Sequence, residues 1–481
     1  MPCRCISNVG LTGWMARQVF GHGIIDGRWM PTAVLRRPRP ARADLSTIPL
    51  PRIVAGIEFG HDVVTGTGRP MRKFSDTPLG KFFGFERKGA SMLRQGLALV
   101  KGNPHIIETS VREVWNNLVG VPLYRRFDPG GSTLPGEITL DLTRRCNLKC
   151  AMCTQIRHTA EIPPELSWYD SERELPLSKW IDILDQVTAF RPRLHITGGE
   201  PLLYPGFREL IREAKRRRFF TRVTSNGTLL AGMADLLVSL GVEVVSVSLD
   251  GPEEVHDRIR GVAGAFRRTT AGAKTLLELR NALGKRIPLL AVICTVSKDS
   301  LNTLKETVPL ALALGADVLE VHHTFFDSPG NVAKHNRIFS ADRARRRGME
   351  LILPEVLDFE YYRSRIEAED LALLQETLSE MRERAKGRLN MVFVPNLPRE
   401  LIGPYYLDLE YAFPEVCKSL WKSCRIYPDG SVAPCLHVYI GNITEQPLLE
   451  LWNSPGMRAF RETINEGLFP ACARCCSRRF T

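Results

Sequence analysis

The sequence lacks any run of about 18 or more uncharged apolar residues, the length that a membrane-spanning helix needs. The stretch from Ala234 to Leu249 comes closest, but Asp235 and Glu243 interrupt it. A secretory pattern is also lacking, because no apolar segment follows a basic start within residues 1–20. We therefore expect no membrane span and a cytoplasmic location, where thiols stay reduced.

The composition has no extreme either. Hydrophobic residues make up 44% and charged residues 25%, which excludes a wholly disordered chain, a collagen-like fibre and a disulfide-stapled miniprotein. At roughly 150 residues per domain, a chain of 481 residues predicts about three domains, or one large domain with appendages. The net charge of +12 favours acidic partners, but it is not evidence of nucleic-acid binding.

Composition and periodicity divide the chain into five regions. Residues 1–44 contain seven arginines, no lysine and two acidic residues, which is typical of a basic, poorly ordered leader. The role of residues 45–133 is not readable from their sequence. We expect the main domain at residues 134–340, a charged and mostly helical linker at 341–415, and a compact cysteine-rich domain at 416–481.

Short apolar strands alternate with helical segments in the main domain. The strands are expected at Glu137–Thr143, Arg193–Thr197, Phe220–Ser225, Val242–Asp250, Leu289–Ser297 and Val318–Phe325. This alternation predicts a parallel sheet and an α/β fold class, specifically a partial (β/α)6 TIM-type barrel. The small C-terminal domain and a partly disordered N-terminal extension complete the expected architecture.

Polar side chains alternate with apolar ones along the predicted strands. Ser246, Ser248 and Asp250 share one strand face, and Glu320 and His322 share a face of another strand. If the apolar faces meet the helices, the barrel interior is polar and suits a charged ligand; the alternative is a half-solvated sheet. Glu320 and His322 are candidates for substrate contact or proton transfer, or else they form a hydrogen-bonded structural pair.

Nine of the twelve cysteines fall in two tight clusters, which indicates metal or iron–sulfur ligation in a large cytoplasmic chain. The first cluster, Cys146, Cys150 and Cys153, directly follows a predicted strand, at the mouth of the barrel. Three thiolates can hold three irons of a [4Fe–4S] cluster and leave the fourth iron open to a small molecule. A structural zinc site is the alternative, but it normally takes four protein ligands.

With the companion segments Gly198-Gly199-Glu200, Ser225-Asn226 and Ser246 to Asp250, this cysteine motif resembles the radical S-adenosylmethionine (SAM) enzymes over roughly residues 134–330. The resemblance implies that the glycines admit the methionine moiety, that Glu200 pairs with its ammonium group, and that Met152 packs near the adenine. It further implies contacts to the ribose and methionine end of SAM from Ser225, Asn226, Ser246, Ser248 and Asp250. Either Arg258 or Arg260 is expected to meet the SAM carboxylate.

The resemblance also implies a mechanism. A one-electron donor such as flavodoxin or ferredoxin reduces the cluster, SAM is cleaved, and the resulting 5′-deoxyadenosyl radical abstracts hydrogen from a substrate. The cofactors carry this chemistry, while the protein orients the reactants and excludes water.

The second cysteine cluster begins in a predicted β-hairpin, Cys417 to Cys435, whose turn is Pro428-Asp429-Gly430. It resembles the SPASM/Twitch extensions of radical SAM enzymes, which hold auxiliary iron–sulfur clusters. Six cysteines are too few for two auxiliary clusters, so we expect one [4Fe–4S] cluster. Its candidate ligands are Cys417, Cys424, Cys435, Cys472, Cys475 and Cys476, with Cys435, Cys472 and Cys475 the strongest and Cys417 or Cys424 the fourth. A zinc ribbon is the alternative.

The sequence therefore predicts an enzyme that forms a radical on a substrate carbon. By analogy with related enzymes we expect a peptide or natural-product precursor as substrate. An RNA- or nucleotide-modifying enzyme is the first alternative, because basic runs occur at Lys215–Arg218 and Arg343–Arg347. A non-catalytic iron–sulfur or zinc scaffold, with no SAM turnover, is the second.

Overall fold

The structure is a computed structural model. It describes residues 112–113, 115–153, 173–324, 326, 329–338, 342, 346, 364–408, 411, 417–435, 438–472, 474 and 475. All of these residues belong to one of the two compact units of the chain, Arg72–Thr481. The predicted leader and most of residues 45–133 lie outside the described residues.

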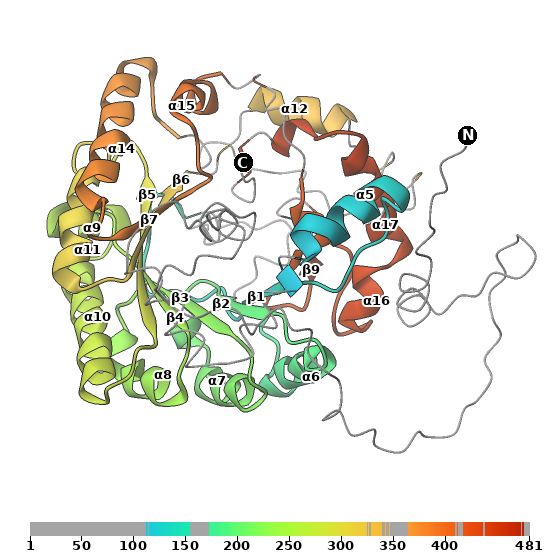
Figure 1. Cartoon of the computed structure of the whole chain (residues 1–481), viewed down its shortest axis with the longest axis horizontal. Helices are drawn as coiled ribbons and strands as arrows, with labels where there is room; N and C mark the ends of the chain where they lie inside the picture. The colour runs from blue at the N-terminus through green and yellow to red at the C-terminus, as the bar shows by residue number, and fades with distance from the viewer. Residues whose placement is uncertain are drawn as a thin grey trace, which may run out of the picture. The chain divides into compact units, whose positions relative to one another are not determined.

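One nine-stranded sheet organises this unit, in the order β7-β6-β5-β4-β3-β2-β1-β8-β9 (Figure 1). The first eight of these strands are parallel neighbours, and β9 is antiparallel to β8. The strands are β1 (Glu137–Asp141), β2 (Arg193–Thr197), β3 (Thr221–Ser225), β4 (Val244–Ser248), β5 (Leu289–Val296), β6 (Val318–His323), β7 (Asn390–Val394), β8 (Ser423–Ile426) and β9 (Val432–Ala433). The α/β class and all six predicted strands are confirmed, with ends shifted by up to two residues.

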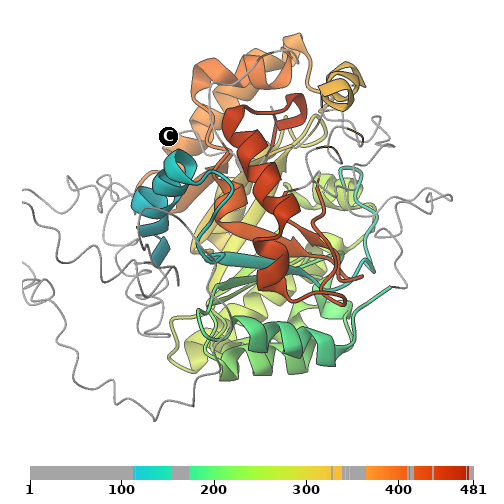
Figure 2. The ribbon, with the colours of Figure 1, turned by 90° about the vertical axis from the view of Figure 1, so that its right-hand side faces the viewer.

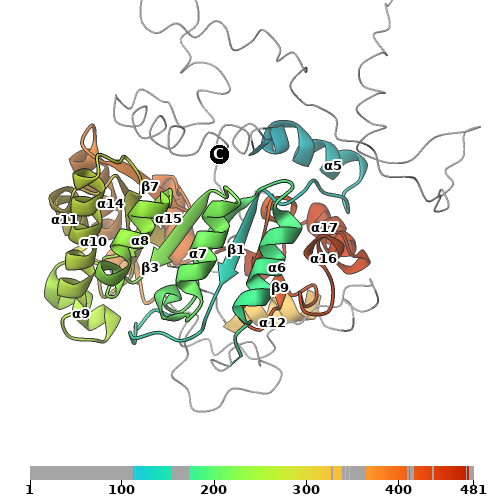
Figure 3. The ribbon, with the colours of Figure 1, turned by 90° about the horizontal axis from the view of Figure 1, so that it is seen from below.

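Helices cover the outer face of this sheet in chain order (Figures 1 and 3). They are α6 (Leu177–Val187), α7 (Phe207–Arg216), α8 (Ala234–Leu240), α10 (Ala265–Ala282), α11 (Thr307–Leu314) and α14 (Leu371–Ala385). In α7, Leu210, Ile211 and Ala214 are buried, as expected of an amphipathic helix, and the exposed residues are charged: Arg208, Glu209, Arg212 and Arg216. The remaining helices are α5 (Val121–Phe127), α9 (Glu253–Arg260), α12 (Pro329–Ile338), α15 (Arg399–Tyr406), α16 (Leu448–Trp452) and α17 (Pro455–Glu466).

Polar side chains gather on the strand faces that do not meet the helices. In β2, Leu194 and Ile196 are buried, whereas His195 and its neighbours on the opposite face are half-buried. Across the interior, Arg222 Nη2 lies 2.7 Å from Glu320 Oε2, and His195 Nε2 lies 2.9 Å from Thr224 Oγ1. The strand alternation therefore gave the correct inward face.

The C-terminal hairpin extends the main sheet, because β8 pairs with β1. Arg425 on β8 donates to both carboxylate oxygens of Asp141 on β1, at 2.9 and 2.8 Å. Helix α17 lies beside α5 (Figure 2), where Arg125 donates to Asn465 Oδ1 at 2.8 Å. Fully buried Arg461 of α17 donates to the carbonyls of Leu420, Gly130 and Trp452. The N-terminal end of the described chain is thus fastened to the C-terminal module.

None of the helices in the described part of the chain combines the length and the apolar character that a membrane crossing requires.

Candidate active site

A cavity of about 240 Å³ lies at the carboxyl ends of β2 to β5. Its wall combines sulfur groups, small residues, hydroxyls, an amide and a guanidinium: Cys146, Leu148, Cys150, Met152, Cys153, Thr197, Gly198, Gly199, Thr224, Ser225, Asn226, Ser248, Arg260 and Thr295. Strands that are far apart in sequence therefore bring both halves of the predicted site to one place, as parallel strands do at their carboxyl edge.

The loop after β1 carries the three cysteines and rests on the glycine pair after β2. Gly199 N–H donates to Thr143 O at 2.7 Å. A Cβ on Gly198 would lie 2.6 Å from Thr143 O, and one on Gly199 would lie 2.4 Å from Arg145 O. Gly198 also has a φ of +143°, which disfavours other residues. The two glycines thus let two backbone segments touch and fix the cysteine loop.

The three cysteines are half-buried, and each lines the cavity. Burial raises the pKa of the Cys146 thiol to about 11, although Asn226 Nδ2 lies 3.8 Å from its sulfur. Burial also raises the pKa of Cys150, an effect that Arg260 partly offsets. A bound iron would reverse this balance, because metal coordination deprotonates a thiol.

This donor set fits a [4Fe–4S] cluster better than a single ion. Within the described ranges, no three His, Cys, Asp or Glu side chains surround one metal position. In a cubane each cysteine binds a different iron, so the thiolates need not converge as ligands of one zinc ion do. The remaining wall of glycine backbone, hydroxyl and amide groups suits a polar small molecule.

Glu200 lies behind the cavity wall and is fully buried. Its carboxylate accepts hydrogen bonds from Ser225 Oγ at 2.8 Å, Asn226 N–H at 2.7 Å and Leu202 N–H at 3.2 Å. Burial raises the pKa of this carboxyl to about 7, against the opposing effect of the three donors. In this arrangement Glu200 orients Ser225 and Asn226, both of which line the cavity.

The structure distinguishes the two candidate arginines. Arg260 lines the cavity and pairs with Asp250, whereas Arg258 is exposed and donates to the carbonyl of Asp299. Asp250 and Ser246 are both fully buried and do not line the cavity, and Asp250 instead holds Arg260 and Thr295, which do. Met152, Ser225, Asn226 and Ser248 line the cavity directly.

Glu320 and His322 lie on the interior face of β6, as predicted, with His322 Nε2 at 3.3 Å from Glu320 Oε2. His322 is in register with Thr295, which lines the cavity. Burial opposes ionisation of Glu320, but the hydrogen bonds and charges of His322 and Arg222 lower its pKa to about 2. The interior next to the cavity thus holds an ionised carboxylate.

Sequence reasoning missed several interior residues. Thr295 lines the cavity, and Arg222 and Arg425 hold the two interior carboxylates. Thr295 and Arg222 occupy inward positions on predicted strands, so the alternation that identified Glu320 was an available signal for them. Arg425 carried no such signal, because its strand was expected in a separate domain.

The C-terminal cysteines occupy two environments. Cys417, Cys435, Cys472 and Cys475 are half-buried, whereas Cys424 is buried on β8, where desolvation raises its pKa to about 12. The sixth candidate, Cys476, lies outside the described residues.

Arg474 anchors the segment between Cys472 and Cys475. It is almost fully buried, and its guanidinium donates to backbone carbonyls at the end of α15, including Tyr405 O at 3.1 Å. Tyr405 Oη donates back to Arg474 O at 3.2 Å. The C-x2-C segment is therefore held by its intervening arginine.

The basic run at the end of α7 is engaged by acidic neighbours. Lys215 Nζ lies 2.6 Å from Glu243 Oε1, and Arg216 and Arg217 both pair with Glu213. Lys215 and Arg217 are largely buried in these pairs, and Arg216 is the exposed member of the three. The second run, at 343–347, lies almost entirely outside the described residues.

Comparison with known proteins identifies the family. The family model of the radical SAM superfamily matches residues 140–307, and that of an iron–sulfur cluster-binding domain, SPASM, matches residues 417–476. The AdoMet-dependent heme synthase of Methanosarcina barkeri is 30% identical over 353 residues, which cover 71% of this chain and 88% of that protein. The chain belongs to the radical SAM superfamily.

Other radical SAM relatives are similarly distant. The PqqA peptide cyclase of Ruegeria pomeroyi is 29% identical over 360 residues, covering 72% of this chain and 81% of that protein. Among solved structures, SuiB of Streptococcus suis bound to S-adenosylmethionine is 18% identical, with a TM-score of 0.47 and 68% of each chain covered. The two matched family models show that this radical SAM enzyme uses a [4Fe–4S] cluster and SAM, and that residues 417–476 form an auxiliary iron–sulfur domain.

Proposed function

We propose that the cavity binds SAM against a core cluster held by Cys146, Cys150 and Cys153, and that the enzyme abstracts hydrogen from a carbon of a substrate in the barrel interior. The observation that carries this proposal is the convergence of these cysteines, the glycine pair and the strand-end hydroxyls on one cavity. When bound, the cluster and SAM supply a 5′-deoxyadenosyl radical.

The residues of the cavity bind and orient SAM. The backbone at Gly198 and Gly199 admits the methionine end of SAM, while Asn226 and Ser248 offer hydrogen bonds to its polar groups and Met152 packs near its adenine. Glu200 fixes Ser225 and Asn226 from behind.

Glu320 and His322 face the proposed substrate region. The Glu320 carboxylate is held by Arg222, and the neighbouring His322 side chain is one-third exposed. Glu320 therefore acts as a fixed acceptor for a substrate hydrogen-bond donor, while His322 is the candidate for moving a proton.

We propose a peptide precursor as the substrate, which the similarity to a PqqA peptide cyclase supports. A tetrapyrrole is the second candidate, because the match to the heme synthase covers 88% of that protein. The two differ in which compound raises 5′-deoxyadenosine formation above the substrate-free background. A flavodoxin or ferredoxin as electron donor, and the cytoplasmic location, remain predictions.

The core assignment is tested by Cys150→Ala. This variant should lose 5′-deoxyadenosine formation, measured chromatographically after anaerobic reduction with SAM, because the cluster loses a ligand. Cys294→Ala is the matched control, since Cys294 is buried in β5 and does not line the cavity. Appreciable product from Cys150→Ala would contradict the assignment.

We propose one auxiliary [4Fe–4S] cluster, held by Cys417, Cys435, Cys472 and Cys475, with buried Cys424 as a core residue. The reconstituted protein should then contain about eight iron and eight sulfide per chain. Cys435→Ala should retain the core cluster and lose about four iron. Unchanged iron content would contradict an auxiliary site at these residues.

A further inference from the structure

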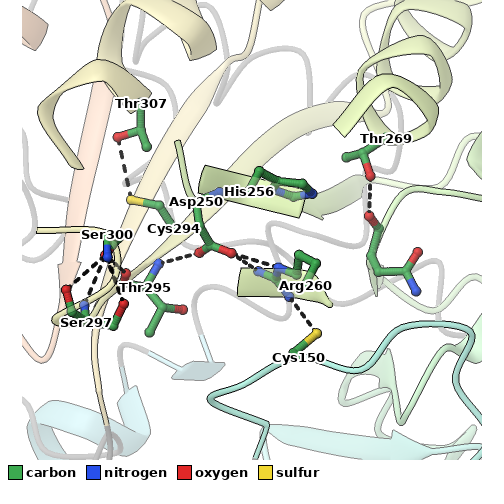
Figure 4. A network of polar contacts seen from close by, with 11 residues as sticks. Cys150, Asp250, His256, Arg260, Thr269, Cys294, Thr295, Ser297, Ser300 and Thr307 are labelled. Atoms are coloured by element: carbon green, nitrogen blue, oxygen red, sulfur yellow. Dashed lines mark hydrogen bonds and ion pairs between the residues drawn. The ribbon is translucent and has the colours of Figure 1, made fainter. Parts of the chain in front are cut away.

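Arg260 bridges a proposed cluster ligand and a buried carboxylate. Its Nη1 lies 3.7 Å from Cys150 Sγ, and its Nε and Nη2 each lie 2.7 Å from Asp250 Oδ2 (Figure 4). We infer that the Asp250–Arg260 pair positions Cys150 and sets the reduction potential of the core cluster. This inference rests on the proposed cluster site.

Asp250 is held in a fixed position, from which it orients Arg260. It is fully buried directly beyond β4, and its Oδ1 accepts the N–H of Thr295 at 3.0 Å. Both carboxylate oxygens are therefore engaged, one by the β5 backbone and one by Arg260 (Figure 4). The guanidinium is a planar fork, so this contact also fixes the direction of its remaining N–H groups.

The backbone of α9 holds the same loop. Lys149 N–H donates to Arg260 O at 3.0 Å, and Ala151 N–H donates to Ile259 O at 2.9 Å. These two bonds flank Cys150 and satisfy carbonyls that a helix end leaves without partners. The end of α9 thus restrains Cys150 in two ways: its backbone carbonyls bind the residues on either side of Cys150, and the Arg260 side chain contacts the sulfur.

The positive charge of Arg260 is expected to affect the reduction potential of the cluster. Burial opposes this charge, but Asp250 and Cys150 more than compensate and raise the pKa of Arg260, so the guanidinium stays protonated. Hydrogen bonds to cluster sulfurs and the local net charge set iron–sulfur potentials. A cationic donor at Cys150 favours the reduced cluster, which carries one more negative charge.

The experiment measures the midpoint potential of the core cluster by EPR-monitored redox titration, without SAM. It uses the reconstituted full chain carrying Cys435→Ala, so that the core signal is read alone. Arg260→Gln should shift the potential to more negative values, because a cationic donor is lost. Asp250→Asn should shift it to more positive values, because the charge that compensates Arg260 is removed.

Arg258→Gln is the matched control. Arg258 lies two residues earlier on α9 and carries the same charge, but it is exposed and bonded to Asp299 O. Its potential should equal that of the parent protein. If Arg260→Gln does not retain core iron, Arg260→Lys is measured in its place. Lysine keeps the charge but cannot bridge Asp250 and Cys150 as a planar fork does, so the hydrogen bond to the sulfur is lost and the potential should still shift to more negative values.

Parent-like potentials in Asp250→Asn and in the iron-containing Arg260 variant would overturn the inference. Parent-like potentials together with weakened SAM binding would assign Arg260 to the SAM carboxylate instead. Neither result would affect the proposed function, which fails only if Cys150→Ala still forms 5′-deoxyadenosine.

Discussion

At the scale of single residues, the site depends on groups that lie behind its wall. Glu200 touches no cavity space, but it fixes the backbone and side chain of two residues that do. Three donors converge on its two oxygens, so the carboxylate shape matters as well as its charge. The cluster of donors explains why a fully buried carboxyl is tolerated there.

Glu200→Gln should therefore be costly despite its equal size. Its single carbonyl oxygen can serve Ser225 and Leu202, which leaves the N–H of Asn226 facing an NH2 group. We expect a loss of about 1–3 kcal/mol in the free energy of unfolding, measured by urea titration, and weaker SAM binding. Wild-type stability and SAM affinity would contradict this role.

Arg258 and Arg260 show what residue-level reasoning could not decide. Residues two positions apart on a helix point in directions that differ by roughly 200°, so only one of the two can face a given site. The sequence narrowed the choice to these two residues, and only the docking of α9 selected Arg260. The cysteines needed no such step, because all three lie on one short loop.

At the scale of elements, α9 serves as a brace for the cluster loop. The helix ends at Arg260, and the next residue, Gly261, has a φ of +69° and a position where a Cβ would lie 2.4 Å from Lys149 O. A glycine at this position thus allows both the left-handed turn after the helix and close contact with the loop. The helix end and the loop are two parts of one rigid support.

Gly261→Ala should release the core iron. Gly284→Ala is the matched control, because Gly284 has a φ of +60° but no atoms within 4 Å of its would-be Cβ. Both variants should lose about 1 kcal/mol through the left-handed conformation. Only Gly261→Ala should also lose about four iron per chain in a colorimetric assay. Equal iron content in the two variants would contradict the brace.

The six central strands were predictable because each is a short apolar run between helical segments. β7 was missed, since Asn390–Val394 falls within a region expected to be a mostly helical linker. β8 was expected as part of a local hairpin, and its pairing with β1 links residues almost 300 positions apart. Local patterns do not contain such pairings.

At the scale of the whole molecule, burial of histidines makes the described unit sensitive to acid. Burial lowers the pKa of His256 to about 4 and those of His195 and His323 to about 3. Below pH 6.5, the ordinary pKa of histidine, the unfolded chain binds more protons than the folded one at these residues. The free energy of unfolding therefore falls as the pH is lowered. Glu200 has the opposite effect between about pH 7 and 4.5. Because its pKa is raised in the folded protein, the folded chain binds the extra proton, and stability at this residue rises as the pH is lowered.

The three histidines outweigh the one carboxyl. The free energy of unfolding should fall by about 2 kcal/mol for each pH unit by which the pH is lowered between pH 6.5 and 5, as measured by urea titration of the reconstituted protein. His323→Gln should flatten this dependence by about one proton. A parent-like slope in that variant would show that His323 does not contribute.

The sequence by itself determined the family, the core cysteine triad, the six strands and their inward faces, because each follows from local spacing and alternation. The tertiary structure decided which arginine reaches the cavity, that Glu200 supports the wall, and that β7 and β8 widen the sheet. These features depend on how distant segments dock. Docking is fixed by buried contacts between them, such as the bond between Arg425 and Asp141, which no local pattern encodes.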